Sequence, residues 1–159
     1  SMVNLPGTSE REGIEISGRF LLTPQLTLGA SYTYLDASDP DGLEEIRRAP
    51  HSGRADLNYV FANGRGNFNI AAIYNGDAFD NNWVSFLAPT RVVLDEYLLV
   101  NAAISYDVLP GLQIFGRVDN ILDERYEEIT GYNTLGIAAY GGLKITLEDP
   151  ATAHWAKYR

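Results

Sequence analysis

Residues 26–34 read LTLGASYTY, and their apolar and polar side chains alternate without a break. Successive side chains of a β-strand point to opposite faces, so this stretch predicts a strand with one apolar face and one polar face. The same alternation recurs six times along the chain. The other predicted strands cover residues 13–22, 54–61, 67–75, 98–107, 112–119 and a last stretch that ends at 147. The sequence therefore predicts an all-β protein.

Short and long connections alternate between these predicted strands. The short reversals cover residues 23–25, 63–66 and 109–111, and the long polar segments cover residues 36–52, 77–96 and 123–137. Outer-membrane barrels combine short periplasmic turns with long extracellular loops. We therefore expect an antiparallel up-and-down meander of seven to eight strands, which is part of a transmembrane-type β-barrel or closes into one.

Strand length and tyrosine placement favour the same fold. A strand that crosses a bilayer at a tilt needs about 9–11 residues, whereas strands of soluble domains average about 5–6. The predicted strands are of the longer kind. Tyr34, Tyr59, Tyr74 and Tyr106 lie near strand ends on the apolar face, where aromatic girdles of membrane barrels are found.

Composition excludes several classes of function. The 159 residues carry a formal net charge of −9, which argues against a nucleic-acid partner, because a phosphate backbone needs a basic surface. There is no cysteine, which excludes a disulfide framework. No apolar run reaches the length of about 18 residues typical of a membrane helix. No catalytic motif is present, so we expect neither an enzyme nor a bound cofactor.

Two other architectures fit the alternation. A soluble β-barrel or β-sandwich, acting as a binding or structural module, would turn the apolar faces inward as its core. A complete small outer-membrane barrel would need an eighth strand, from residues 3–5 or from the C-terminal tail. The direction of Leu28, Ala30 and Tyr32, towards lipid or towards an interior, distinguishes the membrane form from the soluble form.

The segment GRVDNILDERY at residues 116–126, followed by GYNT at 131–134, resembles the C-terminal signature of TonB-dependent outer-membrane receptors. Residues 11–15 (REGIE), 32–37 (YTYLDA) and 47–52 (RRAPHS) are similar to earlier segments of the same family. The resemblance covers residues 9–148 and is strongest to cobalamin and siderophore transporters. We expect residues 1–8 to be a tag or linker remnant and residues 149–159 to form a tail of unknown role.

The resemblance implies a fragment of an active transporter of the bacterial outer membrane. Such receptors are large barrels closed by a plug domain and energised by TonB, and they take up a corrinoid or a ferric siderophore. This chain has no plug segment, so we do not expect it to transport alone. Its expected partners are outer-membrane lipid, the small-molecule ligand and, in the full-length parent, TonB and the plug. Open sheet edges also predict self-association of an isolated fragment.

Candidate site residues fall into two groups. Exposed aromatic and amide side chains on long loops suit a bulky ligand, and the candidates are Trp83, Phe86, Tyr132 and Asn133. Polar side chains on the other strand face would line the barrel lumen, and these are Arg19, Arg54, Asp56, Arg117 and Lys144.

The first long segment is acidic, and its sequence DPDG at residues 39–42 resembles part of a calcium loop. The remaining ligand spacing of such a loop is absent, so we expect no metal site. We interpret the segment as a solvated loop whose charge is partly balanced by Arg47 and Arg48.

Overall fold

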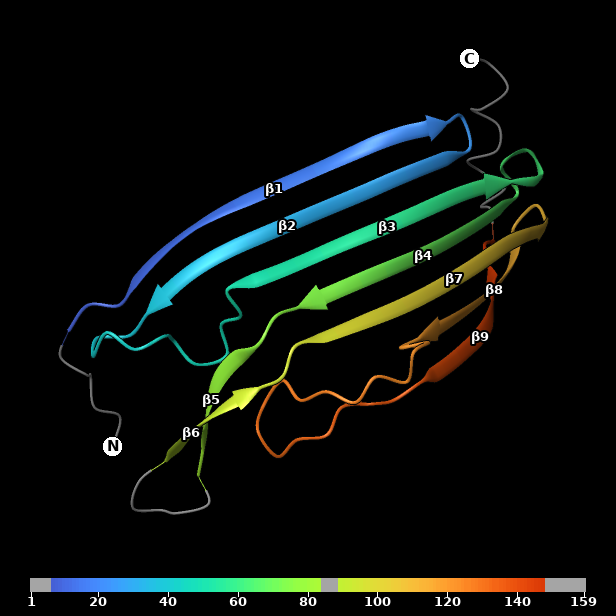
Figure 1. Cartoon of the computed structure of the whole chain (residues 1–159). Helices are drawn as coiled ribbons and strands as arrows, with labels where there is room; N and C mark the ends of the chain where they lie inside the picture. Colours follow the sequence, from blue (N-terminus) through green and yellow to red (C-terminus); the bar gives the residue numbers. More distant parts are fainter. Residues whose placement is uncertain (1–6, 84–88, 148–159) are drawn as a thin grey trace.

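The computed structural model describes residues 7–83 and 89–147. Its main feature is one antiparallel sheet with the strand order β1-β2-β3-β4-β7-β8-β9 (Figure 1). The strands are β1 (Glu10–Thr23), β2 (Leu26–Ser38), β3 (His51–Phe61), β4 (Gly66–Asn75), β7 (Tyr97–Leu109), β8 (Leu112–Asp119) and β9 (Ala138–Ile145). All seven strands predicted from the alternation are confirmed.

A second, two-stranded sheet extends the connection between β4 and β7. It consists of β5 (Ala78–Asn82) and β6 (Thr90–Leu94), which pair antiparallel. The sequence predicted only a loop here, because these strands are short and β5 ends in Asp80, Asn81 and Asn82. No helix among residues 7–83 and 89–147 is long and apolar enough to cross a membrane.

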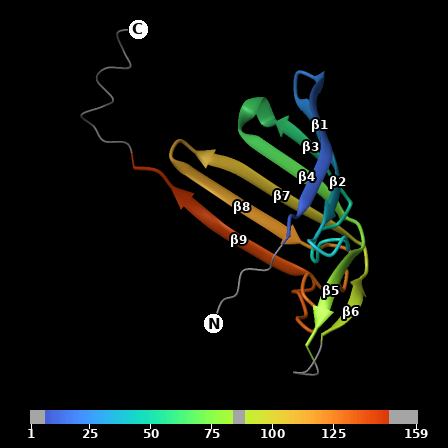
Figure 2. The ribbon, with the colours of Figure 1, turned by 90° about the vertical axis from the view of Figure 1, so that its left-hand side faces the viewer.

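The sheet is twisted and curved, as Figure 2 shows, and its connections differ between the two ends. The turns β1–β2, β3–β4 and β7–β8 are short and lie together at one end in Figure 1. The β3–β4 turn contains a 3₁₀ turn, η1 (Ala62–Gly64). The three long loops lie at the opposite end. The alternation of short turns and long loops therefore separates the two rims as the sequence predicted.

The register of the strands gathers apolar side chains on one face. Leu28 pairs with Phe20 on one side and Leu57 on the other, and the row continues through Ile70 and Ala102. This face is not packed against a second layer, and Ile16, for example, is 64% exposed. Buried apolar side chains in the described part are limited to Ala37, Ala71, Ala78 and Leu94. A soluble sandwich would bury this face, so the single bare layer favours the membrane form.

Aromatic side chains bracket the apolar face. At the short-turn end, the ring of Phe61 stacks between those of Tyr59 and Tyr106, with centroid distances of 6.0 and 6.3 Å. At the long-loop end, the Tyr32 hydroxyl and His51 Nδ1 share a hydrogen bond of 2.7 Å. Tyr34 packs on the same imidazole at 5.3 Å. These two bands correspond to the aromatic girdles of an outer-membrane barrel.

Candidate functional site

The three long loops meet at one buried carboxylate. Asp80 of β5 has no exposed surface. Its Oδ1 accepts hydrogen bonds from Arg47 Nε and from the Asn81 N–H, both at 2.8 Å, and its Oδ2 accepts one from the Thr130 N–H at 2.8 Å. Arg47 belongs to the β2–β3 loop and Thr130 to the β8–β9 loop. One side chain of the β4–β7 connection therefore binds both of the other loops.

The surroundings of Asp80 keep it ionised. Burial alone raises the pKa of this carboxyl, because a low-dielectric environment disfavours charge. The hydrogen bonds from the Thr130 and Asn81 N–H groups and from Arg47 outweigh burial, so the pKa lies below its ordinary value. A charged carboxylate accepts hydrogen bonds more strongly than a neutral group. The three-loop contact is therefore held by an anion at neutral pH.

The β5–β6 hairpin is fixed against the first loop by two further contacts. The Arg47 N–H donates to the Phe79 carbonyl at 2.6 Å. The Arg91 guanidinium lies 4.3 Å from the centroid of the Phe79 ring and also donates to the Glu44 carbonyl. The ion pair between Arg47 and Asp80 corrects one expectation, because the Arg47 guanidinium pairs with the hairpin rather than balancing the charge of its own loop.

The acidic first loop is held by hydrogen bonds to its own carboxylates. Asp39 Oδ1 accepts hydrogen bonds from the N–H groups of Asp41 and Leu43, at 3.0 and 2.9 Å. Glu45 pairs with Arg11 of β1 at 2.6 Å, and this hydrogen bond lowers the pKa of Glu45. Within the described ranges, no group of three or more His, Cys, Asp or Glu side chains is arranged to hold a metal ion.

The third loop begins with a turn that depends on Asn120. Asn120 has a φ of +52° and is buried, and its amide donates to the carbonyls of Glu124 and Leu135. Asn101 Oδ1 of β7 accepts the Asn120 N–H at 2.8 Å. Asparagine tolerates positive φ better than most residues and also supplies these donors. This turn gives a physical reason for the asparagine at position 120, the first residue of the Asn-Ile-Leu-Asp segment.

The rest of the third loop folds back over the polar face of the sheet. The Tyr126 ring packs on the Tyr97 ring of β7, with a centroid distance of 4.2 Å. The Tyr97 hydroxyl donates to Glu128 at 3.1 Å, and Thr134 Oγ1 donates to the Tyr126 carbonyl at 2.6 Å. Tyr97 and Asn101 lie on the strand face opposite Leu98 and Val100. The loop therefore covers the polar face at this end and leaves the apolar face bare.

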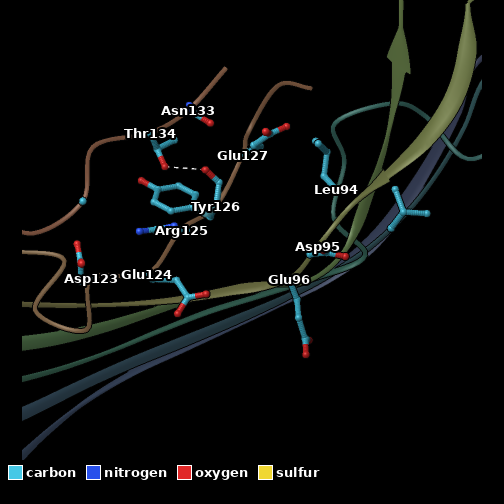
Figure 3. A pocket seen from close by; sticks show the side chains of 12 residues that line it. Leu94, Asp95, Glu96, Asp123, Glu124, Arg125, Tyr126, Glu127, Asn133 and Thr134 are labelled. Atoms are coloured by element: carbon cyan, nitrogen blue, oxygen red, sulfur yellow. Dashed lines mark hydrogen bonds between the residues drawn. The ribbon is translucent and has the colours of Figure 1, made fainter. Parts of the chain in front are cut away.

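A cleft of about 660 Å³ opens between this loop and the β6–β7 turn (Figure 3). Its lining residues are Val93, Leu94, Asp95, Glu96, Asp123, Glu124, Arg125, Tyr126, Glu127, Asn133, Thr134 and Gly136. In Figure 3 the Glu96 side chain extends to the other side of the sheet from Tyr126, and it accepts a hydrogen bond from Tyr74 of the apolar face. The cleft has the size of a small-molecule site and a polar, mainly acidic lining.

The candidate ligand residues differ in their distance from the cleft lining. Asn133 lines the cleft. Tyr132, on the third loop, is 71% exposed, and Trp83, directly after β5, is 62% exposed. Neither belongs to the cleft lining. Phe86 lies outside the described residues. Sequence reasoning missed Asp80, Tyr97 and Asn120, and for Asn120 the Asn-Ile-Leu-Asp sequence was the available signal.

The candidate lumen residues share the polar face. Arg54 and Asp56 of β3 are 3.8 Å apart, and the Asp56 carboxylate lies over Gly29 of β2. Arg117 of β8 lies 3.3 Å from Asp119 and 4.5 Å from the centroid of the Tyr140 ring. Strand register places the other two on the same face, Arg19 opposite Gly29 and Lys144 opposite Gln113.

Residues 1–121 match the family model described as "TonB dependent receptor-like, beta-barrel". The vitamin B12 transporter BtuB of Photobacterium profundum is 35% identical over 127 residues, covering 79% of this chain and 19% of that protein. The vitamin B12 transporter BtuB of Vibrio cholerae is 31% identical over 141 residues, covering 86% of this chain and 22% of that protein. The chain thus spans about a fifth of the length of these relatives.

Solved structures show the same fold. The pyoverdine outer-membrane receptor FpvA of Pseudomonas aeruginosa superposes with a TM-score of 0.74 at 16% identity, covering 87% of this chain and 22% of that chain. The ferric-catecholate import receptor Fiu of E. coli gives a TM-score of 0.69 at 20% identity, with 86% and 21% covered. The described sheet therefore matches a segment of a large receptor barrel.

Proposed function

This chain belongs to the TonB-dependent receptor-like β-barrel family, and we propose that it is a wall segment of an outer-membrane receptor for a corrinoid. The family consists of transporters and receptors of the outer membrane rather than enzymes. In this proposal β1–β4 and β7–β9 cross the membrane, and the three long loops face outward. The tight turns then lie at the periplasmic rim.

The cleft beside the third loop is the observation that carries the proposal. It joins the outward loops to the polar face, so a ligand captured there has access to the lumen. Asn133 supplies an amide and Tyr126 an aromatic wall, and Tyr132, next to Asn133 in sequence, supplies exposed aromatic surface. A bulky ligand that carries amide groups can hydrogen-bond to this polar lining and place an apolar part against the Tyr126 ring.

Charge favours a corrinoid over an anionic ferric siderophore. Asp95, Asp123, Glu124 and Glu127 line the cleft against a single guanidinium, that of Arg125. Carboxylates repel an anionic iron chelate but accept hydrogen bonds from the amide side chains of a corrinoid. The matches to vitamin B12 transporters at 31–35% identity support the same choice, whereas the siderophore receptors share the fold.

Partners follow from the family in the same proposal. Outer-membrane lipid covers the apolar face, and a plug domain of the full-length parent contacts the lumen residues Arg19, Arg54, Asp56, Arg117 and Lys144. TonB energises the parent. The outer edges of β1 and β9 are unpaired within the described residues, and neighbouring strands of the parent barrel would pair with them. An isolated segment would instead associate with further copies through these edges.

Direct binding tests the proposal. The intact natural protein, purified in detergent, is titrated with cyanocobalamin and with a ferric catecholate siderophore by isothermal calorimetry. We expect saturable cyanocobalamin binding, weakened about tenfold by Asn133→Ala, as for the loss of one central contact. Gln25→Ala at the opposite rim is the matched control and leaves the affinity unchanged. Saturable binding of the siderophore alone would replace the corrinoid, and binding of neither would reject the proposal.

A further inference from the structure

Among residues 7–83 and 89–147, Asp80 is the largest side chain that is completely buried. It takes no part in the strands that form the wall, because β5 and β6 make a separate sheet. It lies instead where the β2–β3, β4–β7 and β8–β9 loops meet. A buried charge is costly unless it is paired and hydrogen-bonded, so its position calls for an explanation.

All of its partners are donors. Arg47 Nε, the Asn81 N–H and the Thr130 N–H each point a hydrogen at the carboxylate. A carboxylate is the only side-chain group that offers two acceptor oxygens and no donor. An amide of the same shape would turn an NH₂ group towards one of these donors. The arrangement is therefore specific for Asp80 rather than for any polar residue of similar size.

The contacts span long distances in sequence. Arg47 is 33 residues before Asp80, and Thr130 is 50 residues after it. Thr130 lies between Glu127 and Asn133 in the third loop. Glu127 and Asn133 line the cleft. A smaller hollow of about 210 Å³, lined in part by Arg47, Ala78 and Glu127, adjoins the contact. A change at Asp80 therefore reaches one wall of the cleft without touching a ligand.

We propose that Asp80 is a positioning residue that makes the three outward loops move as one unit and so presets the cleft. Without it, the third loop loses its hydrogen bond to the β5–β6 hairpin, whereas the first loop keeps the Arg47 N–H and Arg91 contacts to the hairpin. Two contacts internal to the loops also remain, the Asp39 turn of the first loop and the Glu127 hydrogen bond to the Gly131 N–H of the third. The coupling of the loops is a property of the ligand-free protein, and only its effect on the cleft rests on the proposed function.

Spin labels on two loops test the coupling. The chain has no cysteine, so Leu43→Cys and Leu135→Cys add two specific sites in it, both on exposed side chains. In the intact natural protein without ligand, we expect Asp80→Asn to mobilise the label at 135 and to broaden the distance distribution between the two labels at least twofold. Asp39→Asn is the matched control, because its bonds stay within the first loop, and it is expected to mobilise the label at 43 only.

Two results of the spin-label experiment would count against the coupling of the loops. An unchanged label at 135 in Asp80→Asn, or an equal response of that label to Asp39→Asn, would overturn the proposal. Should Asp80→Asn not fold, Arg47→Gln removes one donor from the same contact and is expected to broaden the distance distribution; a width equal to that of the parent protein overturns the proposal. Coupled loops in a protein that binds no cyanocobalamin would reject the proposed function and leave the positioning role standing.

Discussion

Asn120 and Glu124 hydrogen-bond to each other in both directions. The Glu124 N–H donates to Asn120 Oδ1, and the Asn120 amide donates to the Glu124 carbonyl, each at 2.9 Å. With its additional bonds to Asn101 and Leu135, the Asn120 side chain and N–H join β7 to both ends of the third loop. This turn sets the position from which the loop folds over the polar face.

Substitution of Asn120 tests that turn. Asn120→Ala removes the side-chain bonds and places alanine at a φ of +52°, which together cost about 2–4 kcal/mol in unfolding free energy. Asn120→Gly removes the same bonds without the backbone strain and is expected to cost less than Asn120→Ala. Urea unfolding of the intact protein in detergent measures both. Equal stability of the parent and Asn120→Ala would contradict the structural role.

Two adjacent residues of β2 test the faces of the sheet. Leu28 lies in the apolar row, and Leu28→Arg is expected to cost about 2–4 kcal/mol if it lies near the bilayer midplane. Thr27→Arg is the matched control on the polar face, where Thr27 pairs with Asn58, and it is expected to cost little. Unfolding from lipid vesicles gives both values. A larger cost for Thr27→Arg would reverse the assignment of the two faces.

Gly66 makes room for the aromatic band at the short-turn end. A Cβ on Gly66 would lie 2.2 Å from the Phe61 ring, which stacks between Tyr59 and Tyr106. Gly66→Ala must therefore displace the ring, at a cost of about 1–3 kcal/mol in unfolding free energy. Gly53→Ala, whose nearest contact would be an ordinary 3.4 Å, is the control. Identical stability of the two variants would speak against the tight packing of this band.

The pH dependence of loop coupling follows from Asp80. Its pKa in the folded protein lies below the ordinary value of 3.8, so its stabilising contribution is complete above that value and is lost as the pH falls through the folded pKa. The label at 135 should therefore keep its line shape, and its distance distribution to the label at 43, from pH 7 to pH 5, and both should broaden only below about pH 4. Loosening between pH 7 and pH 5 would contradict the role of Asp80.

The strands of the wall were predictable because each has one uniformly apolar face. Leu26–Tyr34 shows this most clearly, and lipid on one side with a polar lumen on the other enforces a period of two over the whole strand. β5 and β6 were not predicted, because a hairpin in an outward loop does not separate lipid from a polar lumen and so needs no strict alternation. Ala78 and Leu94 are its buried apolar residues, and they pair with each other across the two strands although they lie sixteen positions apart in the sequence.

The candidate site was less predictable, for a different reason. Asn133 lines the cleft, as expected of a loop amide, and the Asn120 turn belongs to a segment that the family resemblance singled out. The partners of Asp80 come from loops 33 and 50 residues away. Such contacts have no local pattern, since they depend on the strand order that brings the loops together. Nothing in the residues around Arg47 distinguished a guanidinium that pairs with a distant carboxylate from one that balances its own loop.

Solvent accessibility along β2 tests the membrane assignment most directly. Single cysteines at residues 26–34 of the intact protein in native outer membranes would carry spin labels, and their collision rates with oxygen and with a water-soluble nickel chelate would be compared. We expect Leu28, Ala30 and Tyr32 to favour oxygen, which partitions into lipid, and Thr27, Gly29 and Ser31 to favour the chelate. Alternation in the opposite phase, or none along the strand, would contradict a barrel wall with this face towards lipid.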